Sequence, residues 1–181
     1  MLTREKLIEL EAAGRVHDFL FFWGHTPKSP HAVDASCLSQ WFDAPFVLDG
    51  VRYATAEHYM MAEKARLFRD EEALARVLAA TTPADAKAAG RAVRNYDDAE
   101  WGRARSAAVV RGNVAKFGQH AAMGAFLEAT GERLLVEAAP RDTIWGIGMG
   151  ASNPNARKPA AWRGKNLLGF ALMEARAALR R

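Results

Sequence analysis

The sequence predicts an α+β fold, built as a single, mostly helical domain over residues 1–181. Three observations lead to this prediction. Long alanine- and leucine-rich segments follow helix-capping residues, a few short apolar runs have the length of strands, and no repeat or long linker divides the chain. A length of 181 residues is also close to that of one domain and is ample for one hydrophobic core.

The first third of the chain contains most of the expected strands. Residues 2–13 predict a short leading helix that ends at Gly14. The segment HDFLFFWGH has the aromatic and apolar density of a buried strand running into a loop, and the loop after it holds two prolines. Two short apolar runs then flank Asp49-Gly50, a pair typical of the tight turn in a β-hairpin.

Helices dominate the remainder. Thr55 is a candidate N-cap for a helix with Glu57 and His58 in its first turn. RLLVEAAP predicts a short buried strand, and residues 141–166 form an aromatic, glycine-rich loop. The other helices are expected over residues 71–80, from Thr82-Pro83 to about Gly90, over about 98–117, onward through HAAMGAFLEAT to Thr130-Gly131, and over KNLLGFALMEARAALRR.

Composition narrows the class of protein. No apolar run approaches the roughly 18 residues that a membrane span needs, and the charged start lacks the apolar core of a secretory signal, so we expect a cytoplasmic protein without a membrane partner. The net charge of +4 and the pI near 9.5 favour an anionic ligand. Because no dense basic tract is present, they indicate nucleic acid less strongly.

Several kinds of chemistry find no support. Cys37, the one cysteine, excludes an internal disulfide framework and cannot supply a zinc site by itself. EHYMMAEK lacks the two-histidine spacing of a zinc-protease helix, and the glycines of GIGMGA do not have the spacing of a dinucleotide-binding loop. We therefore expect no metal site and no cofactor. With no G-x-S-x-G motif and no base near Cys37, hydrolysis by a serine or cysteine nucleophile is also unsupported.

Two carboxyls and an amine are the candidates for chemistry. Glu57 and Lys64 are seven residues apart, close to two helical turns, and so lie on one face of their helix. Glu57 and Asp142 each have aromatic neighbours, and burial there favours a raised pKa and a role as general acid. Paired carboxyls are the usual apparatus for glycoside hydrolysis, whereas a desolvated lysine can form a Schiff base with an opened sugar. A solvated Glu57–Lys64 surface pair is the simpler alternative.

Two aromatic loops are candidate ligand walls. Trp23, Gly24 and His25 follow the first strand, and the loop at 141–166 contains Trp145 and Asn166. Tryptophan offers a flat face to a base, and amides offer hydrogen bonds to sugar hydroxyls. The alternative is that these tryptophans merely pack on the core and His25 is solvated. Trp101 has the same two interpretations, as a site residue or as core.

Several motifs together resemble a known family. FFWGHTP, CLSQWF, YATAEHYMMAEKARLF, AKAAGRAVRNYDDAEW, RGNVAKFGQH, IWGIGMG and WRGKNLLGFALMEAR occur in the order found in the NADAR, or YbiA-like, N-glycosidase family. The resemblance covers about residues 19–179 and implies the YbiA-like α+β fold. It also implies hydrolysis of an N-glycosidic bond in one of two substrate classes, namely ribosylamino-pyrimidine phosphates of riboflavin synthesis or ADP-ribosyl guanine, including ADP-ribosylated DNA.

The resemblance also assigns roles to residues. It implies that Glu57, Lys64, Trp101 and Asp142 are catalytic, and that Trp23, Gly24, His25, Trp145 and Asn166 bind the substrate, without a metal or redox cofactor. One departure is EAAP before Asp142, where the family pattern has EASP. The resemblance therefore does not carry over a hydrogen bond from this position, while the role of Asp142 is retained. Two other functions stay open, a non-catalytic ADP-ribose or nucleotide-binding module and a nucleic-acid-binding protein. The oligomeric state is not predicted.

Overall fold

A computed structural model describes residues 1–30 and 32–180 of the chain. Its elements are α1 (Arg4–Ala12), β1 (Phe19–Phe22), the 3-10 helix η1 (Ala35–Leu38), β2 (Phe46–Leu48), β3 (Val51–Tyr53), α2 (Ala56–Leu67), α3 (Glu71–Ala79), α4 (Pro83–Arg91), α5 (Asp98–Gln119), α6 (Ala121–Ala129), β4 (Leu134–Glu137), η2 (Pro159–Ala161) and α7 (Leu167–Leu179). The predicted α+β fold with a few short strands is confirmed.

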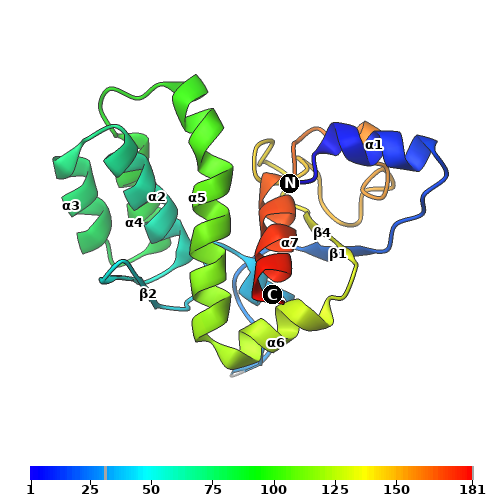
Figure 1. Cartoon of the computed structure of the whole chain (residues 1–181), viewed down its shortest axis with the longest axis horizontal. Coiled ribbons are helices and arrows are strands. Elements are labelled where there is room, and N and C mark those ends of the chain that lie inside the picture. The colour runs from blue at the N-terminus through cyan, green and yellow to red at the C-terminus, as the bar shows by residue number, and fades with distance from the viewer. Residues whose placement is uncertain (31, 181) are drawn as a thin grey trace.

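The long helix α5 divides the molecule. Figure 1 shows α2, α3 and α4 on one side of α5, and α7, β1 and β4 on the other. β1 and β4 form a parallel pair, in register from Phe19 opposite Leu134 to Phe22 opposite Glu137. β2 and β3 form the predicted antiparallel hairpin, in which Asp49 and Gly50 both adopt positive φ. A two-residue turn of this kind matches the twist of the strands that it joins.

Local capping chemistry explains where the helices begin. The Thr55 hydroxyl accepts a hydrogen bond from the His58 N–H, and the Thr82 hydroxyl accepts one from the Asp85 N–H with Pro83 in the first turn. The segment after α5 does not continue the helix directly as the sequence suggested, because His120 is extended and separates α5 from α6. The His120 ring lies 2.8 Å from the Pro45 carbonyl oxygen, which fixes this break.

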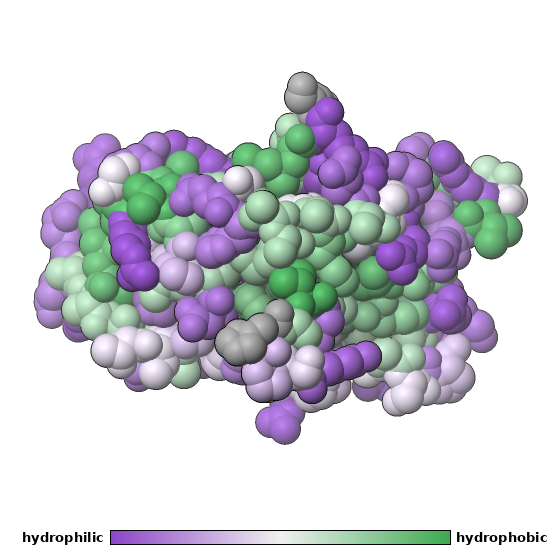
Figure 2. Space-filling model, turned by 90° about the horizontal axis from the view of Figure 1, so that it is seen from below, coloured by the Kyte–Doolittle hydropathy of each residue, from purple (hydrophilic) through white to green (hydrophobic). Residues whose placement is uncertain are grey.

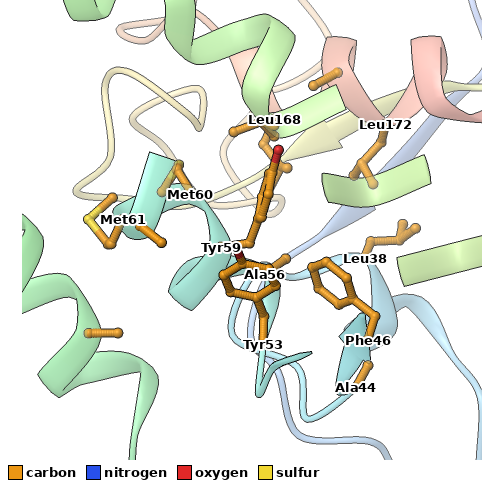
Figure 3. Packing of buried hydrophobic residues seen from close by; sticks show 14 of the residues in the cluster. Leu38, Ala44, Phe46, Tyr53, Ala56, Tyr59, Met60, Met61, Leu168 and Leu172 are labelled. Atoms are coloured by element: carbon orange, nitrogen blue, oxygen red, sulfur yellow. The ribbon is translucent and has the colours of Figure 1, made fainter. Parts of the chain in front are cut away.

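Aromatic side chains around α2 form much of the main core. Phe46, Tyr53 and Tyr59 gather beside α2, with Leu168 and Leu172 of α7 nearby (Figure 3). The Tyr53 and Tyr59 rings meet edge to face at a centroid distance of 5.1 Å, a favourable geometry for two aromatic rings. The core therefore fixes α2, the helix that carries Glu57 and Lys64, against the hairpin and α7.

One face of the molecule carries a broad group of apolar residues (Figure 2). Figure 2 views the molecule from below, where hydrophobic residues occupy much of the middle of the face and hydrophilic residues its rim. Such mixtures are usual on folded proteins, so we assign this face no role. Among the helices of the described chain, none combines the length and the apolar character that crossing a membrane requires.

Candidate active site

The carboxyl ends of the parallel strands create the site. Because Phe22 lies opposite Glu137, the chain leaves β1 into Trp23 at the point where β4 ends. The Ala138 N–H donates to the Phe22 carbonyl oxygen at 2.9 Å and extends the ladder to this edge. Ligands of α/β proteins commonly bind at the carboxyl ends of parallel strands. Trp23 and Glu137 come from distant parts of the sequence and meet here.

Glu57 is a buried carboxyl. It lies in the first turn of α2 with 3% of its surface exposed, and its backbone N–H donates to the Gln40 carbonyl oxygen at 2.9 Å. Within residues 1–30 and 32–180 its Oε1 atom has no hydrogen-bond partner. Burial raises the pKa of Glu57 to about 7, and the Asp142 charge adds to this rise, while Lys87, the Trp41 indole and Arg91 oppose it. The predicted effect of burial on Glu57 is thus present.

Glu137 is a second carboxyl of this kind, which the sequence pattern did not identify. Burial raises its pKa to about 8, with further upward contributions from the charges of Asp142 and Glu57 and an opposing one from Lys87. Its buried Oε2 atom has no partner among the described residues. The available signal was a glutamate at the carboxyl end of an apolar strand, five residues before Asp142. Its significance depends on the pairing of β1 with β4.

Asp142 completes a group of three carboxyls. Its Oδ1 atom accepts the N–H of Ile144 at 2.9 Å and of Trp145 at 2.7 Å. The carboxylate is therefore held by its own loop, with alanine at position 139 where the family pattern has serine. Because the Asp142 charge raises the pKa of both Glu57 and Glu137, these three side chains form one electrostatic unit.

Cations and aromatic rings adjoin this unit. Lys87 of α4 affects the pKa of both glutamates, and its Nζ lies 5.6 Å from the centroid of the Trp41 ring. The Trp41 ring is in turn 5.7 Å from the His25 ring. Lys87 and Trp41 were not predicted as site residues. Trp41 is the tryptophan of the CLSQWF motif, so the sequence contained a signal for it.

The predicted ligand walls differ in accessibility. Trp23 has 69% of its surface exposed, and Gly24 beside it adopts a φ of +83°, a conformation that favours glycine. Trp145 is half-buried against the main core. Asn166 is fully buried: its Oδ1 accepts the Glu137 N–H at 3.0 Å and its Nδ2 donates to the Leu135 carbonyl oxygen at 3.0 Å. Its amide thus holds the end of β4 and positions Glu137.

Lys64 lies in the last turn of α2, about two turns after Glu57. The Lys64 amine donates to the Gly90 carbonyl oxygen at 2.8 Å and is 4.1 Å from the Tyr96 ring centroid. Burial and the Arg91 charge lower the Lys64 pKa, whereas Asp98 opposes this change. The Arg91 charge also lowers the pKa of Glu57.

Trp101 is placed apart from the carboxyls. It is 6% exposed and lines a groove of about 460 Å³ between α2 and α5. The other lining residues are Glu63, Arg66, Leu67, Ala104, Ala107, Ala108 and Arg111. None of Glu57, Glu137 or Asp142 lines this groove, so the structure does not bring Trp101 together with them.

The buried glutamates make a testable contribution to stability. The native pKa values of Glu57 and Glu137, about 7 and about 8, exceed the ordinary value of 4.5. Between pH 4.5 and these native values, the native state therefore holds more protons than the unfolded chain. The free energy of unfolding therefore decreases as the pH rises through this window. Between about pH 5.5 and about pH 8.5, we expect the melting temperature to fall less in Glu137→Gln than in the wild type. The control is Glu128→Gln, an exposed position; equal falls in both variants would contradict this account.

Known proteins share this fold and sequence. The NADAR domain model matches residues 21–180. An N-glycosidase of Acanthamoeba polyphaga mimivirus is 36% identical over 163 residues, which cover 87% of this chain and 94% of that protein. The N-glycosidase YbiA of Escherichia coli is 32% identical over 81% of each chain. The NMR structure of the E. coli protein YbiA superimposes with a TM-score of 0.72 at 29% identity, covering 92% of this chain and 88% of that one. The chain belongs to the NADAR domain family, as its motifs predicted.

Proposed function

We propose that this protein hydrolyses the N-glycosidic bond between a ribose and a base. The relatives named above are N-glycosidases, and the chain is an enzyme of the same class, a hydrolase of N-glycosyl compounds. The observation that carries the proposal is the pair of buried glutamates beside Asp142, with pKa values of about 7 and about 8. A carboxyl with such a pKa is protonated in a large share of the molecules at neutral pH and can donate this proton to a leaving nitrogen.

The three carboxyls have separate tasks in this reaction. Glu57 donates its proton to the base nitrogen while the bond between this nitrogen and the anomeric carbon breaks, so that the bonding electron pair leaves with the base. The Asp142 carboxylate stabilises the positive charge that develops on the ribose and accepts a proton from the attacking water. The water oxygen bonds to the anomeric carbon. Glu137, protonated at neutral pH, then passes its proton to Glu57, and the proton that Asp142 took from the water returns to Glu137.

The aromatic residues bind the base in this proposal. Trp23 is exposed at the end of β1, the His25 and Trp41 rings lie 5.7 Å apart, and the Trp41 indole lowers the pKa of Glu57. A tryptophan face buries a base at low cost in conformational entropy. Gly24 contributes close backbone approach, and Trp145 with the buried Asn166 supports the opposite loop and the end of β4.

Lys64 has either a covalent or an electrostatic role in the proposal. In the covalent version the neutral amine bonds to the anomeric carbon as the base leaves with the bonding electron pair, and the new ammonium nitrogen gives up a proton to Asp142. The ring C–O bond then breaks, the ring oxygen takes up a proton, and a Schiff base forms, which water hydrolyses to the free sugar and the lysine amine. We expect Lys64→Ala to lower turnover about a hundredfold or more, as is typical for a group in direct contact with the reacting atoms. Borohydride trapping distinguishes the roles: a ribosyl adduct on the wild type identifies the covalent version. Unchanged turnover in Lys64→Ala together with no adduct on the wild type would contradict both the covalent and the electrostatic role.

A product assay tests the proposed function and its substrate class. Two substrates are supplied in parallel, a ribosylamino-pyrimidine 5′-phosphate and a DNA oligonucleotide with ADP-ribosyl guanine. Release of ribose 5-phosphate from the first, or of ADP-ribose from the second, supports the proposal and identifies the class. If neither product forms while ADP-ribose binds, the protein is a binding module. Binding of plain DNA with a steep salt dependence, and no turnover, would instead favour the nucleic-acid-binding alternative.

A further inference from the structure

The face of α4 beside the glutamates carries two cations for which the proposed reaction has no use. Lys87 and Arg91 are four residues apart, and side chains with this spacing are neighbours on one helix face. Among residues 1–30 and 32–180, neither side chain donates a hydrogen bond to a protein group or forms an ion pair within 4.0 Å. Lys87 is half-buried and Arg91 is exposed, so both side chains are accessible to a ligand.

Close packing of α4 on α2 fixes the direction of this face. Ala86 and Gly90, the residues that precede Lys87 and Arg91, are buried. A Cβ atom at Gly90 would overlap the Met61 side chain, so the two helices are in contact there. The Lys64 amine also holds the Gly90 carbonyl oxygen at 2.8 Å. α4 therefore cannot rotate about its axis without losing these contacts, and its two cations stay at the edge of the buried interface.

Both cations act on the group of three carboxyls formed by Glu57, Glu137 and Asp142. The Lys87 Nζ is 5.6 Å from the Trp41 ring, which belongs to the aromatic wall of the site. Lys87 acts electrostatically on Glu57 and Glu137, and Arg91 acts on Glu57 and Lys64. The Asp142 carboxylate is held by two backbone N–H groups of its own loop, and within residues 1–30 and 32–180 no carboxylate lies within 4.0 Å of either cation. A positive charge without a protein partner at the edge of a site is suited to an anionic group on the ligand.

We infer that Lys87 and Arg91 form a phosphate subsite that binds the phosphate attached to the ribose of the substrate. The inference rests on the proposed function for the identity of the sugar, while the subsite itself rests on the geometry of α4. Lysine contributes a point charge, and arginine adds a planar fork that can bind two phosphate oxygens. The phosphate is either the monoester of a ribose 5-phosphate or the diphosphate of ADP-ribose. Both present negatively charged phosphate oxygens that accept hydrogen bonds.

Calorimetric binding of reaction products tests the subsite without requiring turnover. Ribose 5-phosphate, ADP-ribose and adenosine are titrated into the wild type, Lys87→Met, Arg91→Met and Lys87→Arg. We expect each methionine variant to bind its phosphorylated ligand about tenfold or more weakly, the loss of one charge-assisted hydrogen bond. Lys87→Arg should retain most of the affinity, and adenosine should bind all variants equally. The ligand whose affinity falls, ribose 5-phosphate or ADP-ribose, identifies the source of the phosphate.

A matched variant separates this effect from a general change in charge. Arg15 is exposed and precedes β1, at the edge of the strand pair opposite the site, so Arg15→Met removes one positive charge far from the carboxyls. Two results would overturn the subsite. In the first, the affinity for the phosphorylated ligand falls equally in Arg15→Met and Lys87→Met. In the second, it falls in neither Lys87→Met nor Arg91→Met. Tight, Lys87-dependent binding of a phosphorylated ligand without hydrolysis would retain the subsite and reject the glycosidase.

Discussion

Glu57→Gln is expected to lower turnover by about a hundredfold to ten-thousandfold, the usual contribution of a positioned general acid. Glutamine preserves the size of the side chain, but its amide cannot transfer a proton to the leaving nitrogen. The measurement is the initial rate of base release under single-turnover conditions, with the uncatalysed rate subtracted. Because the neutral amide also avoids burying a charge where Glu57 is 3% exposed, the variant should melt no lower than the wild type at neutral pH.

The matched control for this experiment is Glu128→Gln. Glu128 is exposed on α6 and takes no part in the carboxyl unit. Its variant should retain the wild-type rate within a factor of about two, as surface substitutions usually do. If Glu57→Gln also retained the wild-type rate on a substrate that the wild type hydrolyses, the assignment of Glu57 as the proton donor would be wrong.

Gly169→Ala is expected to cause the largest loss of stability. A Cβ atom at this position of α7 would overlap the Leu135 carbonyl oxygen and lie 2.6 Å from the Asn166 Nδ2. Both groups take part in the hydrogen bonds by which the Asn166 side chain holds β4 and Glu137. We expect destabilisation by about 3 kcal/mol, or about 10 °C in melting temperature, because backbone cannot yield as a flexible side chain can. Differential scanning calorimetry measures the change.

Another glycine of the chain provides the comparison for Gly169→Ala. At Gly118 in α5, a Cβ atom would lie 3.4 Å from Leu179 Cδ2, an ordinary contact. Gly118→Ala should therefore stabilise the protein by up to about 1 kcal/mol, since alanine loses less backbone entropy in a helix. A melting temperature for Gly169→Ala as high as that of Gly118→Ala would show that α7 and β4 are not packed as described.

Local chemistry explains why the helices and the hairpin could be predicted. Thr55 and Thr82-Pro83 determine helix starts by groups within three residues, and Asp49-Gly50 determines a turn by the backbone conformation of two residues. The break at His120 could not be predicted in this way. It depends on a contact with Pro45, which is distant in sequence and lies in the segment that leads into β2.

The site was predicted in part, for the same physical reason. Glu57 shows its character locally, as a carboxyl in an apolar helix, whereas Glu137 gains its character from the parallel pairing of β1 with β4. Residue type alone did not reveal that both ends of the Asn166 amide bind the backbone of β4. Spacing likewise could not separate Trp101, which lines the groove between α2 and α5, from the tryptophans near the carboxyls. The role that we propose for Lys87 and Arg91 likewise depends on helix packing.

The pH dependence of kcat/KM tests the central claim most directly, since a buried protonated glutamate must donate the proton. Glu57 and Glu137 have pKa values of about 7 and about 8, so the protonated forms disappear as the pH rises through this range. We predict that kcat/KM falls above about pH 7, approaching a tenfold decrease per pH unit, and that the fall begins at a different pH in Glu137→Gln. A rate that stays constant or increases up to about pH 9 would contradict a glutamate proton donor.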